Sequence, residues 1–349
     1  MSFILFLLVY LSRIIEISIK SEKNNLFYFR KFIIYPFLYY IFLNFIFWLL
    51  NLKFNVKLDE EISIGKSLIL SNFGFQVDRV NFAFSNGVNS YAVILGSIMT
   101  FFSVDIFLNK QWSLKILCLF FIVIICVLLT DARGAIVFPL IISLICYLFY
   151  YFKLKKIIKL TPLLFILLPI FAITIVPLLS NIEMFNQFSR NDTDLFTLNG
   201  RLFIWLFSFE DFMAFKIQHL FGYGFKGHVN SGVSQNWAFV FATYSSPETV
   251  HPHNSILSII FDIGYLGLIT MLIVINKVSK NIYLLYKISK KEALTFFAML
   301  LFIIFISITE SFLNDIYMNT FNLYISFFIY IIASEDNKLN IHQPIKIKK

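Results

Sequence analysis

The sequence predicts an all-helical membrane protein, a polytopic bundle of about nine transmembrane helices with one large, partly helical loop. Of its 349 residues, 59% are hydrophobic and 14% are charged, whereas soluble domains have roughly 45–50% and 25%. Apolar stretches long enough to cross about 30 Å of hydrocarbon recur along the chain. Lys and Arg gather in every second connection between them. We therefore expect a single integral-membrane domain over 1–349.

Nine stretches are apolar and long enough to span a bilayer. They fall at 3–19, 32–50, 88–107, 113–130, 135–152, 158–179, 256–275, 293–309 and 317–333. The chain is nearly continuously apolar from Trp112 to Phe152, but a single helix of that length would be about 60 Å long, twice the hydrocarbon thickness. It must fold back as a hairpin, and the break belongs at its only polar cluster, Thr130-Asp131-Ala132-Arg133-Gly134. The first stretch lacks a basic segment before it and a small-residue cleavage site, so we expect a span there and not a removed leader.

The basic residues set the orientation. One set of connections carries 19 Lys and Arg in 60 residues: 20–31, 108–115, 153–159, 276–292 and 334–349. The alternate set carries 9 in 124 residues: 51–87, 131–134, 180–255 and 310–316. The first set should be cytoplasmic, which places the C-terminus inside, the N-terminus outside and the large loop 180–255 outside. The net charge of +9 follows this topology, so it indicates no nucleic-acid partner.

The large loop should hold its own helix, over 199–212. Asn199 is a suitable N-cap, and the residues after it are apolar almost all round, which is typical of a helix lying against the bundle. The glycine-rich stretch 221–227 that follows predicts a turn. Its Gly222 and Gly224 could alternatively expose backbone N–H groups to an anion, although a plain turn is the simpler interpretation.

Three of the arginines on the predicted outer face are candidates for binding a substrate: Arg79, Arg133 and Arg201. A guanidinium near hydrocarbon needs a partner, and its fixed, bidentate donors suit a phosphate. For Arg133 the alternatives are a salt bridge with Asp131 or snorkelling to lipid headgroups. For Arg201, which has Trp205 one helical turn further on, the alternative is a phosphate-headgroup anchor.

His253 is the natural general base on this face, because a neutral imidazole can accept a proton at ambient pH. Asn254 follows it, and Glu310 also lies outside the spans as a second acid–base candidate. His251 makes a zinc site conceivable, but no outer cysteine or H-E-x-x-H pattern supports a metal. Asp262 is about 13 Å further along the expected helix, so a structural or pore-side role is expected for it. The cysteines at 118, 126 and 146 lie inside apolar runs and predict no disulfide or metal pair.

In their order along the chain, these residues resemble the motifs of the O-antigen polymerases and O-antigen ligases, bacterial membrane glycan transferases. The similar segments are the hairpin Ala132-Arg133-Gly134, the pair Gly200-Arg201 followed by Trp205, the turn Gly222-Tyr223-Gly224, the run His253-Asn254-Ser255 with Asp262-Ile263-Gly264-Tyr265-Leu266-Gly267, and, earlier, Arg79 with the turn at 85–89. Ala132 stands where the family has Ser, and the literal Arg-x10-Gly pattern of some polymerases is absent.

The resemblance implies a glycosyl transfer from an undecaprenyl-diphosphate-linked oligosaccharide to an acceptor hydroxyl, with inversion and without a metal or cofactor. It implies Arg133, Arg201 and Arg79 at the diphosphate, His253 as base, and Asn254, Trp205, Gly222, Gly224, Asp262 and Glu310 in support. The expected location is the bacterial inner (cytoplasmic) membrane, with the site facing the periplasm. Membrane lipid is an expected partner, and so are a chain-length regulator and a flippase of the same pathway.

Two alternatives stay open. A ligase would transfer the glycan to lipid A core, whereas a polymerase would join it to another lipid-linked repeat unit. The compact, Phe- and Ile-rich, Gly-poor chain favours the polymerase by association. A lipid-linked sugar flippase, the competing class, would show polar or Gly/Pro-interrupted residues at the midplane of several spans and repeat symmetry, whereas here the special residues collect at one face.

Overall fold

The computed structural model describes residues 25–52, 66–85, 87–110, 113–179, 200–242, 246–313 and 319–341. Every element in these ranges is a helix, and their only paired extended backbone is a single bridge between Lys66 and Asp78. The predicted all-helical class is thus confirmed for this part of the chain. The elements are, in order, α2 (Asn25–Phe29), η1 (Arg30–Ile34), α3 (Tyr35–Leu49), α4 (Leu68–Asn72), α5 (Val88–Asn109), α6 (Leu114–Thr130), α7 (Arg133–Phe152), η2 (Lys155–Leu160), α8 (Thr161–Leu179), α11 (Arg201–Met213), α12 (Gln218–Phe221), α13 (Gly227–Asn230), η3 (Val233–Phe241), η4 (Pro247–Thr249), α14 (Ser255–Ile288), α15 (Lys290–Ile306) and α16 (Asn319–Ile341).

Four helical segments among the described residues are long and apolar enough to cross a membrane: Leu26–Leu49, Val88–Asn109, Arg133–Phe152 and Ser255–Ile288. Shorter apolar helices occupy Leu114–Thr130 and Asn322–Ala333. Eight of the nine predicted spans thus coincide with helices, while the first, 3–19, lies outside the described residues. The count of nine and the sidedness of the loop stay predictions.

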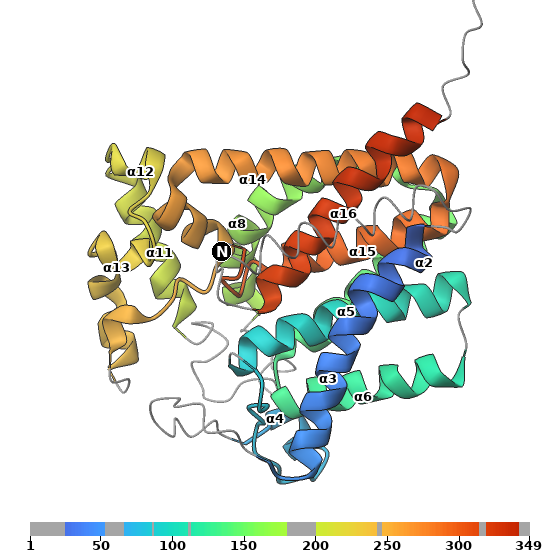
Figure 1. Cartoon of the computed structure of the whole chain (residues 1–349). Coiled ribbons are helices and arrows are strands. Elements are labelled where there is room, and N and C mark those ends of the chain that lie inside the picture. The colour runs from blue at the N-terminus through green and yellow to red at the C-terminus, as the bar shows by residue number, and fades with distance from the viewer. Residues whose placement is uncertain are drawn as a thin grey trace, which may run out of the picture.

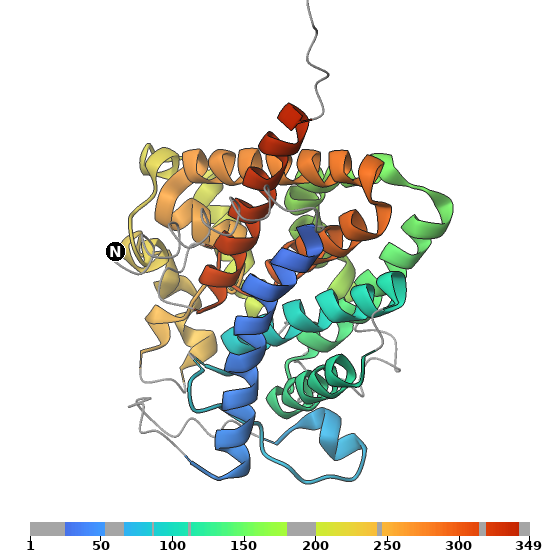
Figure 2. The ribbon, with the colours of Figure 1, turned by 45° about the vertical axis from the view of Figure 1, so that its right-hand side comes forward.

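The centre of the bundle is α5, whose apolar window is 94% buried. It packs against α7, α15, α6 and α16, and the views in Figures 1 and 2 show these helices gathered around it. The contact with α15 and α7 is close at Gly96, where an added Cβ would lie 2.4 Å from the Phe302 ring and 3.2 Å from the Ala135 Cα. A larger residue at this crossing would force the helices apart.

The hairpin turns where the sequence predicts it. α6 ends at Thr130, Asp131 adopts a left-handed φ of 50°, and α7 begins at Arg133. The carboxylate of Asp131 accepts hydrogen bonds from the backbone N–H groups of Leu68 and Ile69, at 3.2 and 3.1 Å. It thereby stabilises the first turn of the short helix α4 and fastens it to the hairpin.

One helix continues past the span that the sequence predicts in it. We expected a helix over 256–275 and a basic connection over 276–292, but α14 continues to Ile288. The physical reason is its periodicity: Val278, Ile282 and Leu285 share one buried face, whereas Lys277, Lys280 and Lys287 point to the exposed side. The added helical turns therefore bury apolar surface without burying charge.

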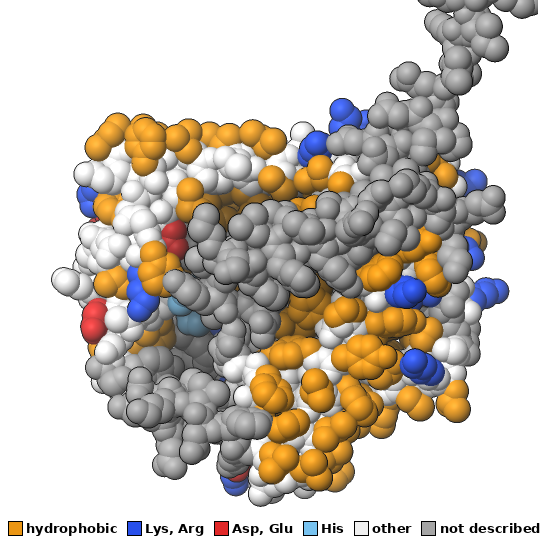
Figure 3. Space-filling model, viewed as in Figure 1, with side chains coloured by type: hydrophobic (Ala, Val, Ile, Leu, Met, Phe, Trp, Pro, Cys, Tyr) orange, Lys and Arg blue, Asp and Glu red, His pale blue; other side chains and the backbone are white. Residues whose placement is uncertain are grey.

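Segment 200–254 folds at one end of the bundle, beside the start of α14, where Figure 1 shows α11, α12 and α13 together. In Figure 3 most of the visible Lys and Arg side chains lie toward the opposite end, with a few at the same end as this segment, and hydrophobic side chains cover much of the coloured surface between the two ends. An apolar surface between more polar ends is typical of a membrane-embedded bundle.

Candidate functional site at the α11, α14 and α15 ends

Helix α11 begins at Arg201 with Gly200 as its N-cap, so the expected cap by Asn199 is not what starts it; Asn199 itself lies outside the described residues. Gly200 has φ of +79°, and a Cβ there would lie 2.5 Å from Val240 Cγ1. Only glycine fits this conformation and this contact without strain. The turn sets the direction in which Arg201 leaves the helix.

Trp205 fixes the buried face of α11. Its side chain is fully buried in an apolar cluster that also contains Trp237 and Phe261. Trp205 is thus a packing residue that anchors α11 beneath Arg201. The alternative of a headgroup anchor concerns the Arg201 guanidinium and stays open.

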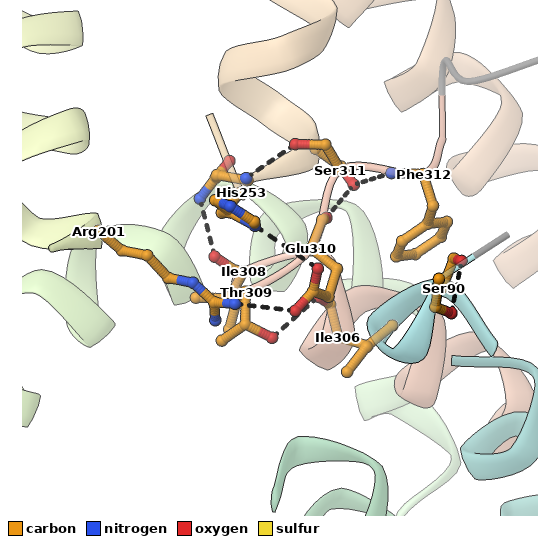
Figure 4. A network of polar contacts seen from close by, with 12 residues as sticks. Ser90, Arg201, His253, Ile306, Ile308, Thr309, Glu310, Ser311 and Phe312 are labelled. Atoms are coloured by element: carbon orange, nitrogen blue, oxygen red, sulfur yellow. Dashed lines mark hydrogen bonds and ion pairs between the residues drawn. The ribbon is translucent and has the colours of Figure 1, made fainter. Parts of the chain in front are cut away.

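The run His253-Asn254-Ser255 ties the start of α14 to the segment that follows α15. Asn254 caps the helix, since its Oδ1 accepts from the N–H groups of Ile256 and Leu257 at 2.9 and 3.2 Å. Ser255 Oγ donates to the Glu310 carbonyl at 2.7 Å, and Ser255 N–H donates to the Ser307 carbonyl at 2.8 Å. Figure 4 shows His253 beside Glu310 and Ser311 at this junction. Its effect is to bring His253 and Glu310, 57 positions apart in sequence, to one place.

Three side chains meet there. Arg201 Nη2 donates to Glu310 Oε1 at 2.9 Å, and His253 Nδ1 lies 3.7 Å from Glu310 Oε2 (Figure 4). The second distance is within ion-pair range but longer than a hydrogen bond. The side chains of Arg201, Glu310 and His253 are 17%, 18% and 27% exposed. All three side chains are thus partly shielded from solvent but still accessible to a bound molecule.

The carboxylate of Glu310 is held in its ionised form. Burial alone would raise the pKa of Glu310, but the charge of Arg201, together with contacts to His253, lowers it below the ordinary value. Glu310 is thus an anion between a guanidinium and an imidazole. This excludes it as a reservoir of protons near neutral pH and fits an orienting role.

The other two arginines lie at the α6–α7 hairpin. Arg79 Nε donates to the Thr130 carbonyl at 2.9 Å, so its guanidinium is fixed to the last turn of α6. Arg133 is the first residue of α7 and is half-buried. A Cβ on its neighbour Gly134 would lie 3.3 Å from Ile306 Cδ1, at the last turn of α15 before Glu310. Both arginines are therefore at the same end of the bundle as Glu310.

The glycine motifs form a contact between backbones. The N–H groups of Tyr223 and Gly224 donate to the carbonyls of Phe261 and Asp262 at 2.7 and 3.1 Å. Because these amides are used, the alternative of an anion-binding turn is wrong, and the plain turn is confirmed. A Cβ on Gly222 would lie 2.4 Å from the Asp262 carbonyl carbon, so this close approach requires glycine.

Asp262 belongs to the same contact. Its Oδ1 accepts from the Gly227 N–H at 2.7 Å, and the helix kinks two residues later at Gly264, which has φ of +79°. These contacts support the structural role expected for Asp262.

The other three histidines among the described residues lie in two separate clusters. His219 is fully buried, accepts at Nδ1 from the Lys216 N–H and contacts Asp211 through Nε2 at 3.0 Å. The rings of His228 and His251 are 5.5 Å apart. Burial, reinforced by His251, lowers the pKa of His228 to about 4, so that ring is neutral at ambient pH. Among the residues described, no three His, Cys, Asp or Glu side chains are grouped so as to hold a metal ion.

One family model matches part of the chain. Residues 118–272 match the family model described as O-antigen ligase. The match covers 155 of the 349 residues, and this part of the chain is similar to that family. This confirms the resemblance inferred from the motifs. No curated protein and no solved structure matches the chain.

The matched segment 118–272 contains Arg133, Arg201 and His253, but it ends before Glu310. Sequence reasoning named Glu310 only because it lies outside the spans; nothing in the sequence pairs it with Arg201, 109 positions away. Folding of the segment after α15 back onto the start of α14 brings the two together.

Proposed function

We propose that the protein is an O-antigen or related surface-polysaccharide polymerase of the bacterial inner membrane. It would join undecaprenyl-diphosphate-linked repeat units at the periplasmic face by metal-independent, inverting glycosyl transfer. The observation that carries the proposal is the contact of Arg201 and His253 with one carboxylate, Glu310, at the end of the bundle.

In this mechanism Glu310 fixes the tautomer of His253. With its Nδ1–H directed at the carboxylate, the imidazole presents the lone pair of Nε2 as base. The acceptor hydroxyl attacks the anomeric carbon, and its proton passes to Nε2. The bond from the anomeric carbon to the diphosphate oxygen breaks, and the electron pair leaves with the lipid diphosphate. The 3.7 Å separation would shorten as the imidazolium forms, as is common when substrate binds.

The leaving diphosphate gains charge, and the arginines supply the compensating cations. Arg201 uses Nη2 toward Glu310, and a guanidinium has five N–H donors, so others can still reach phosphate oxygens. Arg133 and Arg79, at the hairpin on the same end of the bundle, are the proposed second and third contacts.

A ligase is the second candidate, and the description of the matching family favours it. Both reactions use the same donor and differ in the acceptor. Deleting the gene and separating the surface glycolipids on a gel distinguishes them. We expect one repeat unit on the core and no ladder, because ligation survives. Bare core with polymer accumulated on undecaprenyl diphosphate would instead identify a ligase, and an unchanged ladder would contradict both.

Sidedness has its own test. A cysteine at the exposed Gln235, in a chain without its native cysteines, should react with an impermeant thiol reagent in cells with a permeabilised outer membrane. The adjacent Ser234 is unsuitable as the labelling position because it is buried. Reaction only after lysis would contradict a periplasmic site.

A further inference from the structure

The turn between α11 and α13 exposes four large apolar side chains within eleven positions. Phe215, Ile217, Phe221 and Phe225, here called the apolar turn, are each between 59% and 66% exposed. Proteins seldom leave such a patch in water without a partner for it. None of these side chains is needed by the proposed reaction, so the patch requires its own explanation.

A stripe of exposed apolar residues also runs along α14. Ile263, Leu266, Ile269 and Ile273 are between 49% and 63% exposed. The last three follow the kink at Gly264, and their spacing of three or four residues places them on one face of the helix. This helix is one of the four long and apolar enough to cross a membrane. An exposed apolar face on such a helix is a surface that contacts lipid.

The apolar turn and the stripe are directly connected. A Cβ on Gly264 would lie 2.3 Å from the Leu220 carbonyl oxygen and 2.5 Å from the Phe221 nitrogen. The backbone of the turn thus rests on the backbone of α14 at the first residues of the stripe. Figure 3 shows hydrophobic side chains continuing along the upper edge of the molecule, over α12 and α14.

We propose that the apolar turn is embedded in the bilayer, in the leaflet on the side of Arg201 and His253, with phospholipid acyl chains as its partner. A surface continuous with a lipid-facing helix must meet the same lipid. Lys216, the only charged residue within the apolar turn from Phe215 to Phe225, pairs with Asp211 at 2.7 Å and is close to half-exposed, so its ammonium can extend toward headgroups. Segment 200–254 would then be held against the membrane surface, independently of the reaction that the protein catalyses.

Fluorescence quenching in phosphatidylcholine nanodiscs tests this. The full chain, with Cys118, Cys126 and Cys146 replaced by Ala, carries the dye NBD on a single new cysteine. The test positions are Ile217 and Phe221. Ile269 on α14 serves as the lipid control, and the exposed Gln235 serves as the aqueous control of the same segment.

We expect the dyes at both test positions to behave as at Ile269. Lipid carrying a nitroxide at acyl carbon 5 should quench them about twofold more than at Gln235, and iodide should quench them about threefold less. Iodide quenching equal to that at Gln235 would place the turn in water. Protection from both quenchers would mean that protein, such as a second copy, covers it. Either result overturns the proposal.

A second measurement needs no substitution. Diazirine-labelled phosphatidylcholine should crosslink to the native peptide 213–225 in the unmodified protein, at a yield comparable to the peptide that holds Ile269. Absence of this crosslink, with α14 labelled, would also overturn the proposal. The glycolipid ladder reports the proposed function separately, so the two failures are distinguishable.

Discussion

The most direct test of the mechanism is Glu310→Gln. This change keeps the shape of the side chain and removes the negative charge that lies 2.9 Å from Arg201 and 3.7 Å from His253. In the proposed reaction His253 becomes an imidazolium facing Glu310. At 3.7 Å, the charge–charge attraction is about 1 kcal/mol in water and about 4 kcal/mol at an effective dielectric constant near 20. The partly exposed pair lies between these limits.

We therefore expect kcat to fall by about 5- to 1,000-fold, since about 1.4 kcal/mol corresponds to a factor of ten. KM for the lipid-linked donor should change much less, because the lost contact joins side chains of the enzyme and does not involve the substrate. The assay is polymer formation by purified enzyme in nanodiscs with a lipid-linked repeat unit. Glu310→Asp should restore part of the rate because it keeps the charge. Glu210→Gln, at an exposed position of α11, is the matched control and should have no effect.

Wild-type kcat for Glu310→Gln would refute the orienting role of this carboxylate.

The same variant tests the pH dependence of stability. Because the pKa of Glu310 is lowered in the folded protein, its ion pairs stabilise the fold above the ordinary carboxyl range. This stabilisation is lost as pH falls through the lowered pKa. Thermal unfolding in detergent should therefore separate wild type from Glu310→Gln at pH 7 and bring them together in strong acid. An equal difference at both pH values would contradict the assignment.

Three further predictions concern other parts of the site. His253→Ala should lower the rate by about 10²–10⁴-fold, as loss of a general base does, whereas His251→Ala should be milder; equal rates of polymer formation for the two variants would contradict the base assignment. Arg133→Lys should leave the protein level unchanged but rescue little of the activity lost in Arg133→Ala, because an ammonium lacks the bidentate fork; full rescue in the ladder assay would argue for simple charge neutralisation. Gly222→Ala should strongly lower the amount of folded protein, because its Cβ would clash with the α14 backbone. Gly224 has a similar φ but open space around it, so Gly224→Ala should lower the stability by only about 1 kcal/mol, from the left-handed backbone. Immunoblotting of membrane fractions checks this pair, and similar levels of both variants would contradict the close packing.

Much of the fold was predictable because the bilayer imposes a length and a composition on every span. The helices α3, α5, α6 and α7 coincide with predicted stretches, and the hairpin turns at the only polar cluster in its apolar run. The end of α14 was not predictable by the same reasoning. The lysines near the C-terminal end of α14 suggested a loop between two helices. On a helix, however, these lysines share one exposed face and leave the apolar face buried.

The sequence by itself determined which residues could do chemistry, because residue type and the alternation of basic connections select Arg79, Arg133, Arg201, His253 and Glu310 from a largely apolar chain. Tertiary structure alone decided which of them meet. Glu310 contacts Arg201 and lies within ion-pair distance of His253 because Asn254 and Ser255 bind the segment after α15, a long-range arrangement with no periodic signal in the chain. Tertiary structure also decided that Gly222 serves packing between two backbones. A glycine permits a close approach because it has no Cβ, but the sequence does not tell which segment will lie against it.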